Sequence, residues 1–159
     1  KESLHLEEFD LSELTEMVAE EAQGLAESKA VTLTAEIEPG ILVKADQTLM
    51  MRIWLNLLTN AVKYGRQQGQ IWLTLKSDGK NAVGTVCDDG IGISAAELPK
   101  IWKRFYRVNT ARSSGDDSGT GLGLAMVKWM VESHGGTVSA VSTLGAGSTF
   151  SFTIPLRPS

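Results

Sequence analysis

Ile53 to Tyr64 reads I-W-L-N-L-L-T-N-A-V-K-Y, a mostly apolar stretch that carries Asn56, Asn60, Lys63 and Tyr64. Each residue of an α-helix advances by about 100°, so these spacings place the four side chains within roughly one quarter of the helix circumference. A polar seam facing solvent is one interpretation. The apolar neighbours leave little exposed face, however, so we expect the polar quarter to form one wall of a ligand site.

Length and composition limit the possible classes of protein. The 159 residues, 42% hydrophobic and 21% charged, fit one globular domain, expected over residues 1–159. No apolar run approaches the ~20 residues of a membrane-spanning helix, and the N-terminus does not resemble a signal peptide. The single cysteine, Cys87, excludes an internal disulfide framework. The net charge of -4 argues against a nucleic-acid binder, and any anionic ligand needs local cations, a metal ion or backbone amides.

Periodicity and turn signals predict the elements around this helix. Asp10 and Glu13 form a capping box that starts a helix ending near residue 29, and Asp46 caps the helix that carries the polar quarter. Strands are expected at residues 3–9, 31–37, 41–44, 71–76, 82–87, 137–141 and 149–154. Two further helices are expected: a short one that opens at Ser94, breaks near Pro99 and resumes toward Phe105, and one that ends at His134. We expect one mixed sheet covered on one face by helices.

The first glycine loop, Asp88-Asp89-Gly90-Ile91-Gly92, directly follows a predicted strand. A tight turn between strand and helix is the simplest interpretation. A phosphate cradle is disfavoured because two carboxylates would repel phosphate. A buried acceptor for an amine, such as the exocyclic amino group of adenine, suits the residues better, and the glycines would let the backbone approach a flat ring.

The second glycine loop, Gly119-Thr120-Gly121-Leu122-Gly123, follows residues 108–118, a polar stretch without periodicity that we expect to be mobile. It matches neither the dinucleotide fingerprint nor the phosphate-binding P-loop. Its amides at a helix N-terminus would suit an anion, or the loop is only a lid hinge. Just before it, Lys103 to Arg107 groups three cations with two aromatic residues, which is either a solvated helix end or a phosphate-facing group.

Taken in order, these motifs resemble the ATP-binding domain of bacterial sensor histidine kinases, within the GHKL ATPase superfamily. The matching stretches are N-L-L-T-N-A-V-K-Y at 56–64, D-D-G-I-G-I at 88–93, W-K-R-F-Y-R at 102–107, G-T-G-L-G-L at 119–124 and G-A-G-S-T-F at 145–150. The resemblance spans residues 3–156. It implies an α+β fold, a two-layer α/β sandwich whose mixed, mostly antiparallel sheet has about three helices on one face, with an ATP lid at about 106–120.

The resemblance also implies roles for single residues. Asn60, with Asn56 beside it, should ligate Mg²⁺, while Lys63 neutralises phosphate and Tyr64 lies along the adenine of ATP. Asp88 should accept the adenine amino group. The other implied residues are Arg107 and Arg104 at the γ-phosphate, Phe105 as lid anchor, Gly90 and Gly92 for close approach to the base, and Gly119, Gly121 and Gly123 with their amides at the phosphates. Ile93, Thr120, Leu122 and Thr149 are also expected to bind the nucleotide. Such a site supplies positioning and charge stabilisation, which phosphoryl transfer chiefly needs.

The chain has only two histidines, His5 and His134, and neither looks like a phosphate acceptor. We expect His134, at a helix C-terminus, to be favoured as an imidazolium by the helix dipole. The resemblance therefore implies a fragment of a larger kinase. Its expected partners are a histidine-bearing dimerisation domain of the same protein and a response regulator receiver domain, with no nucleic acid and no membrane contact. The fragment would be a cytoplasmic domain of a parent anchored in the inner membrane.

Two other functions compete with the kinase. ATP-hydrolysing members of the superfamily place a general-base glutamate one helical turn before the metal-binding asparagine, and here that position is Asn56, which cannot accept a proton from water. This disfavours efficient hydrolysis. A non-catalytic nucleotide-binding module is the other alternative, and the complete set of motifs argues against it.

Overall fold

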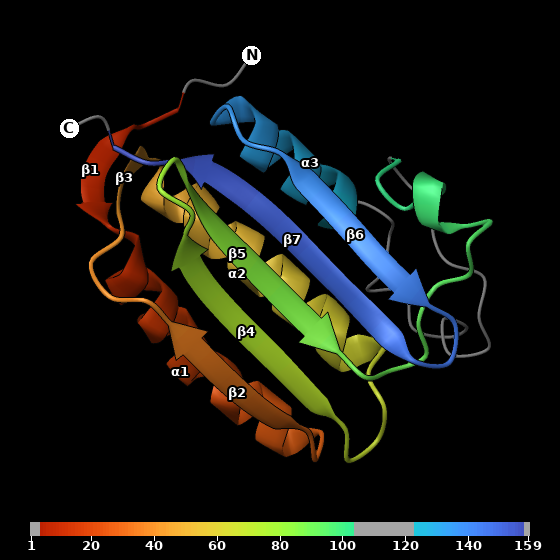
Figure 1. The fold of residues 1–159 in the computed structure, drawn as a ribbon. Helices are drawn as coiled ribbons and strands as arrows, with labels where there is room; N and C mark the ends of the chain where they lie inside the picture. The colour runs from red at the N-terminus through yellow and green to blue at the C-terminus, as the bar shows by residue number, and fades with distance from the viewer. Residues whose placement is uncertain (1–3, 104–122, 158–159) are drawn as a thin grey trace.

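The computed structural model describes residues 4–103 and 123–157. Figure 1 shows a sheet facing the viewer with the helices behind it. The strands are β1 (Glu7–Asp10), β2 (Thr32–Ile37), β3 (Leu42–Ala45), β4 (Gln70–Ser77), β5 (Asn81–Asp88), β6 (Val138–Thr143) and β7 (Gly147–Pro155). The helices are α1 (Leu11–Ser28), α2 (Gln47–Lys63), α3 (Gly123–Ser133) and the short 3₁₀ helix η1 (Leu98–Lys100).

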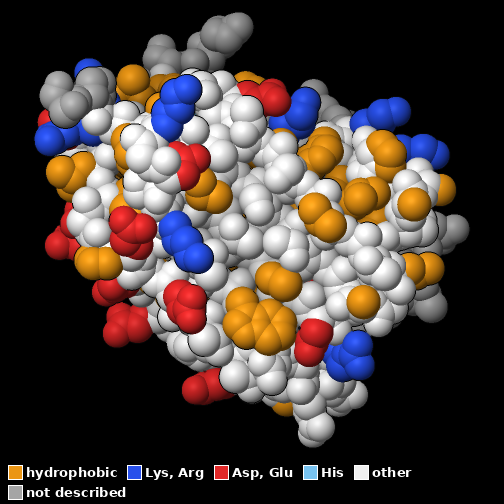
Figure 2. Space-filling model, viewed as in Figure 1, with side chains coloured by type: hydrophobic (Ala, Val, Ile, Leu, Met, Phe, Trp, Pro, Cys, Tyr) orange, Lys and Arg blue, Asp and Glu red, His pale blue; other side chains and the backbone are white. Residues whose placement is uncertain are grey.

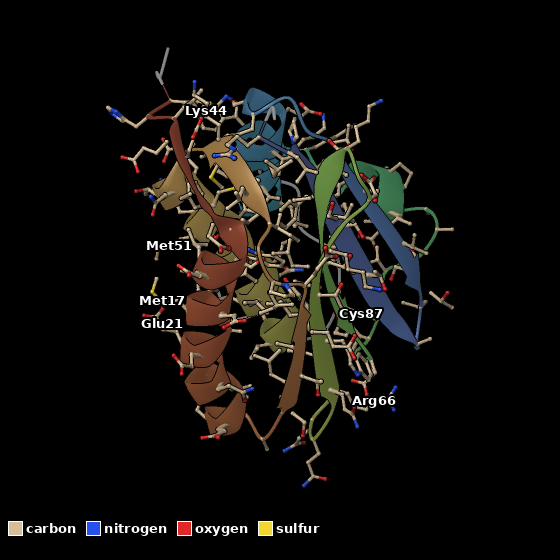
Figure 3. The ribbon with its side chains drawn as sticks, turned by 60° about the vertical axis from the view of Figure 1, so that its left-hand side comes forward. Met17, Glu21, Lys44, Met51, Arg66 and Cys87 are labelled. Carbon is tan, nitrogen blue, oxygen red and sulfur yellow. The ribbon has the colours of Figure 1, made fainter. Side chains whose placement is uncertain are left out.

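The main sheet has five strands in the order β2-β4-β5-β7-β6. β2 runs parallel to β4, and the other neighbours are antiparallel. Figure 3, turned so that the sheet is seen closer to edge-on, shows α1 on one side and the strands on the other. The predicted fold class, an α+β sandwich with a mixed, mostly antiparallel sheet and three α-helices on one face, is confirmed for the part of the chain that the structure describes.

The expectation of a single sheet was wrong, because β1 and β3 form a separate two-stranded antiparallel sheet. The first strand also begins at Glu7 rather than at residue 3. Each of these short strands runs directly into a helix, since α1 starts at Leu11 and α2 at Gln47. The N–H of Leu11 donates to the carbonyl of Ile41 at 2.8 Å, which joins the two junctions. The pair therefore stays at the end of the helix layer, near both termini in Figure 1.

The core lies between α2 and the main sheet. Trp54 of α2 meets Phe152 of β7 edge-on, with ring centroids 4.9 Å apart and planes at 73°. Gly84 of β5 leaves room for this pair, since a Cβ there would lie 2.5 Å from the Phe152 ring and 2.8 Å from Trp54. The buried side chains that complete the core come from all three α-helices and the strands, among them Leu11, Val18, Ile53, Leu57, Leu58, Leu73, Leu75, Val86, Met130, Phe150 and Ile154.

The predicted helix caps are confirmed for α1 and α2. Asp10 Oδ1 accepts from the N–H of Glu13 at 3.1 Å, and Asp46 Oδ1 accepts from the N–H of Leu49 at 3.2 Å. The outer face of α1 stays in solvent, and Figure 3 shows Met17 and Glu21 pointing away from the sheet. The opposite surface of the molecule is the uncovered face of the main sheet, on which Figure 2 shows scattered hydrophobic groups. None of the helices described here is both long and apolar enough to span a bilayer.

The prediction of a short helix from Ser94 is wrong within the described residues. Ser94 Oγ does accept from the N–H of Glu97 at 3.3 Å, but only the three-residue 3₁₀ helix Leu98–Lys100 follows. Pro99 lies inside this turn instead of breaking a longer helix. Proline is tolerated in a first helical turn, where no internal partner awaits its missing N–H, but it cannot support the N–H ladder of a longer helix.

Candidate functional site

The polar quarter of α2 is half-buried. Asn56, Asn60 and Lys63 are all partly covered, and Tyr64 is the C-cap, with its N–H directed to the carbonyl of Asn60 at 3.1 Å. The ammonium of Lys63 lies 5.4 Å from the centroid of the Tyr64 ring, within the range of a cation–π interaction. The last turn of α2 therefore carries carboxamide, ammonium and phenol groups together.

Asp88 is the last residue of β5 and its side chain is buried, with 6% of its surface exposed. It faces the helix layer, since it alternates in phase with the buried Ala82, Gly84 and Val86. Its Oδ1 accepts from the N–H of Gly90 at 2.8 Å. A carboxylate is thus held at the end of a central strand, on the face of the sheet that packs against α2.

Burial raises the pKa of Asp88 to about 6, and the neighbouring charge of Asp89 adds to the rise. Hydrogen bonds from the N–H groups of Gly90 and Ser148 oppose it but do not offset the desolvation. A buried carboxyl with a raised pKa at the end of a strand is a marker of a functional site. Above about pH 6 this group is a charged acceptor enclosed by protein.

Gly90 brings Asp88 and the end of α2 together. A Cβ at Gly90 would lie 2.2 Å from the carbonyl oxygen of Tyr64 and 2.9 Å from Asp88 Oδ1, so these two groups flank the glycine. The N–H of Ile91 donates to the same Tyr64 carbonyl at 3.2 Å. The structure therefore places two motifs that are far apart in the sequence, 56–64 and 88–93, side by side.

Gly92 has a φ of +74°, and a Cβ there would lie 2.1 Å from the carbonyl of Thr143. The following residue, Ile93, is buried, and its N–H donates to Ser142 Oγ at 2.7 Å. Gly90 and Gly92 thus fit the turn closely against α2 and against the end of β6. Their expected role in approach to a flat ring stays a prediction, and the packing alone requires both glycines.

Thr149 lies on the face of the sheet opposite Asp88. Cys87 pairs with Thr149 and Asp88 with Ser148, and Thr149 Oγ1 donates to Cys87 Sγ at 3.2 Å. The residue of β7 that sits beside Asp88 is Ser148, which is buried and was missing from the sequence-based set. The alternation of Phe150, Phe152 and Ile154 toward the core could have identified Ser148, because residue 148 shares their phase.

Several predicted site residues lie outside the described part of the chain. They are Arg104, Phe105, Arg107, Gly119, Thr120, Gly121 and Leu122, together with the lid expected at about 106–120. Gly123 is described: it is the exposed first residue of α3, and a Cβ there would meet nothing within 4 Å.

His134 joins the end of α3 to the start of α2. Its Nε2 accepts from the N–H of Asp46 at 3.0 Å. Its Nδ1 lies 2.7 Å from the carbonyl of Met130 and donates to it. The imidazolium expected from the helix dipole stays a prediction. These contacts support a structural role.

The described residues contain no group of three or more His, Cys, Asp or Glu side chains that could hold a metal ion. The donors that fit a hard cation are the carboxamide oxygens of Asn56 and Asn60. They are neutral and half-buried, one turn apart on α2. This donor set suits a divalent ion that takes its other ligands from water and a phosphate-bearing substrate.

A family model described as "Histidine kinase-, DNA gyrase B-, and HSP90-like ATPase" matches residues 45–158. The chain is similar to the sensor histidine kinase TmoS of Ectopseudomonas mendocina, with 38% identity over 149 residues that make up 93% of this chain and 15% of TmoS. Its fold is similar to the mycobacterial sensor histidine kinase MprB, with a TM-score of 0.83, 28% identity, and coverage of 96% of this chain and 100% of that one.

A full-length ShkA structure in complex with AMPPNP is also similar, with a TM-score of 0.84 and 29% identity over 99% of this chain and 32% of that one. The chain spans between 15% and 40% of the length of the curated relatives it matches. The family model covers the Asp46 cap, the polar quarter of α2, Asp88 and both glycine loops. The chain therefore belongs to the family of histidine kinase-, DNA gyrase B- and HSP90-like ATPases.

Proposed function

We propose that this chain binds Mg²⁺-ATP between the polar quarter of α2 and Asp88, as the nucleotide-binding part of a sensor histidine kinase. The observation that carries the proposal is the buried Asp88 carboxylate, flanked through Gly90 by the carbonyl of Tyr64 at the end of the polar helix face. Family membership, the similarity to sensor histidine kinases and the similarity to ShkA, which was solved with AMPPNP, support it.

Base recognition is assigned to Asp88. Its buried, ionised carboxylate would accept a hydrogen bond from the exocyclic amino group of adenine, while guanine and hypoxanthine present a carbonyl at the same place. A buried acceptor left without its donor is costly, so the site should discriminate strongly between amino and oxo purines. Tyr64, whose ring is half-buried beside this turn, would lie along the base.

The phosphates are assigned to Asn56, Asn60 and Lys63 of the polar quarter. Asn60 and Asn56 would hold Mg²⁺ through their carboxamide oxygens, and Lys63 would bring an ammonium to the phosphate chain. When bound, the metal ion would spread the charge that builds up on the phosphates during transfer. The roles proposed for Arg104, Phe105, Arg107 and the glycines 119, 121 and 123 follow from the family resemblance.

We propose histidine kinase activity for the whole protein. The γ-phosphate would pass to a histidine on a dimerisation domain and from there to a response regulator receiver domain. His134 is held by Asp46 and Met130 and so is a poor acceptor. Because ATP and a receiver domain are partners found in the cytoplasm, we place this domain there, with the parent protein anchored in the inner membrane.

The test is to combine the chain with Mg²⁺-ATP and the dimerisation domain of its own parent protein. Acid-labile phosphate on the dimerisation domain supports the kinase. Steady release of phosphate without the partner would instead identify a hydrolase, against the expectation from Asn56, which cannot act as a general base. Binding of ATP with neither outcome would identify a non-catalytic module.

A further inference from the structure

Asp89 ends the pairing of β4 and β5 in an unusual way. The last pair of the ladder is Ile71 with Asp88. One residue further, the N–H of Asp89 still points to the carbonyl of Gln70 at 3.4 Å. The N–H of Gln70, however, donates to Asp89 Oδ1 at 3.0 Å, where a continuing antiparallel pair would use the carbonyl of Asp89. The side chain takes the place of the backbone, and the chain leaves the ladder here.

The carbonyl of Asp89 that this exchange releases accepts from Arg66 Nε at 2.9 Å. Arg66 belongs to the loop between α2 and β4, which closes on itself through the N–H of Gly69 and the carbonyl of Arg66 at 2.8 Å. A Cβ at Gly69 would lie 2.5 Å from Asp89 Oδ1, so the loop fits closely around this carboxylate. Figure 3 shows Arg66 near the lower end of the strands, on the side away from α1.

The turn that Asp89 starts is fixed on its other side by the groups of the proposed site. The N–H of Gly90 donates to Asp88 Oδ1 at 2.8 Å, and the N–H of Ile91 donates to the Tyr64 carbonyl at 3.2 Å. The direction of the Asp88 carboxylate therefore depends on where the backbone leaves the ladder. Asp89 sets that point through its own Oδ1.

We propose that Asp89 is a positioning residue for base recognition, holding the Asp88 carboxylate in line with the purine amino group through its bonds to Gln70 and Arg66. The inference rests on the proposed function, because it assumes that Asp88 reads the base. Asp89 acts through Asp88, because its Oδ1 is engaged by the N–H of Gln70. Its charge also contributes to the raised pKa of Asp88.

The test compares ADP with IDP, which carries an oxo group in place of the amino group, in calorimetric titrations of the whole chain. Asp89→Ala removes the acceptor for Gln70, whereas Asp89→Asn keeps an Oδ1 in the same place. Asp78→Ala is the matched control: Asp78 Oδ1 accepts from the N–H groups of Lys80 and Asn81 at 2.9 and 2.7 Å, at the opposite end of the same hairpin. Melting temperatures are recorded for every variant.

We expect Asp89→Ala to weaken the binding of ADP about tenfold and to bring the ratio of the affinities for ADP and IDP close to one. Asp89→Asn should keep both within about twofold, because the acceptor geometry survives. In both variants the pH at which ADP affinity falls on acidification should move down, since the charge of Asp89 no longer opposes ionisation of Asp88. Asp78→Ala should change only the melting temperature.

Wild-type affinity and preference in Asp89→Ala, with a lowered melting temperature, would overturn the proposal and leave Asp89 a structural cap. Equal losses in Asp89→Ala and Asp89→Asn would also overturn it, because charge and not geometry would then matter. If Asp89→Ala does not fold, Arg66→Ala replaces it, with Arg52→Ala at an exposed position as the control. Arg66→Ala must then reduce the preference for ADP over IDP, and an unchanged preference would contradict the proposal. A wild-type chain that binds neither nucleotide refutes the proposed function itself.

Discussion

Asp88 combines burial with a neighbouring carboxylate, Asp89, and takes its hydrogen bonds from backbone N–H groups. The folded-state pKa is raised from 3.8 to about 6. A raised pKa favours the protonated form in the folded chain, so this group contributes stability below about pH 4 that is lost as the pH rises through about 6. At neutral pH the charge needed for base recognition therefore opposes folding.

Replacing Asp88 with Asn should separate stability from binding. The carboxamide keeps an Oδ1 for the N–H of Gly90 but removes the buried charge, so the melting temperature of Asp88→Asn should exceed that of wild type at pH 7.5. The difference should shrink as the pH falls to 4, where the wild-type carboxyl is neutral. Thermal melts across this range check the prediction. Parallel curves for the two proteins at all pH values would show that Asp88 does not titrate with a raised pKa.

Gly84 is a residue whose missing side chain shapes the core. A methyl group there would lie 2.5 Å from the Phe152 ring and 2.8 Å from Trp54, which are packed edge-on. We expect Gly84→Ala to lower the free energy of unfolding by about 1–3 kcal/mol through overpacking. The control is Gly24→Ala in α1, where nothing lies within 4 Å and the helix should gain about 0.5–1 kcal/mol. Urea titrations measure both, and a neutral Gly84→Ala would contradict this view of the core.

At the scale of elements, the start of α2 joins three parts of the chain. Asp46 Oδ1 caps α2 by accepting from the N–H of Leu49, and its Oδ2 accepts from the N–H of His5 at 3.0 Å. The N–H of Asp46 itself donates to Nε2 of His134, at the end of α3. Burial alone would raise the pKa of Asp46, but the two N–H donors and His134 lower it below 3.8. A lowered pKa means that the stabilisation is present above about pH 4 and is lost as the pH falls through the folded-state value.

We expect Asp46→Ala to cost about 1–2 kcal/mol of folding free energy at pH 7, because α2 loses its cap and the N-terminal segment loses its acceptor. Asp46→Asn should cost less, since its carboxamide oxygen can still cap the helix. Denaturant titrations at pH 7 and pH 3 test this. The difference in free energy of unfolding between wild type and Asp46→Ala should be smaller at pH 3 than at pH 7. A difference that is constant or larger at pH 3 would contradict the sign of the pKa shift.

At the scale of the whole molecule, periodicity and turn chemistry predicted a mixed sheet covered on one face by helices, and the family resemblance implied the two-layer sandwich. The helices α1 and α2 begin at the predicted caps, Asp10 and Asp46, and β4 and β5 form where strands were predicted at 71–76 and 82–87. The separate β1–β3 sheet was missed because strand pairing is set by the packing of whole elements, which a local pattern does not encode. The helix expected from Ser94 failed because one capping box does not supply an apolar face to bury.

In the candidate site, too, the features set by a local pattern were predicted and those set by long-range packing were missed. The polar quarter of α2 was visible because helical spacing alone places Asn56, Asn60 and Lys63 together. The juxtaposition with Asp88 needed the fold, since it depends on Gly90 resting against the Tyr64 carbonyl. Ser148 was overlooked in favour of Thr149, a one-residue difference that reverses the face of a strand. The hydrogen bond between Asp46 and His134 could not be predicted, because it joins residues far apart in the sequence.

A ligand that binds only the folded chain should stabilise the whole domain. With ADP at about 100 times its dissociation constant, the gain should be about 2.7 kcal/mol, which corresponds to roughly 5–10 °C in the melting temperature of a domain of this size. Differential scanning fluorimetry with ADP and with IDP checks this. A shift with ADP but a much smaller one with IDP is expected, and equal shifts would contradict base recognition by Asp88.

The most direct test of the central claim, one nucleotide site built from α2 and the end of β5, is calorimetric titration of ATP and ITP with and without Mg²⁺. Asp88→Asn should lose the preference for ATP over ITP and keep the gain in affinity that Mg²⁺ provides. Asn60→Ala should do the opposite, losing about tenfold of the Mg²⁺-dependent affinity while keeping the base preference. Thr59→Ala, an exposed neighbour on the same helix, should change neither. Wild-type behaviour in both site variants, or no ATP binding by the wild-type chain, would contradict the account.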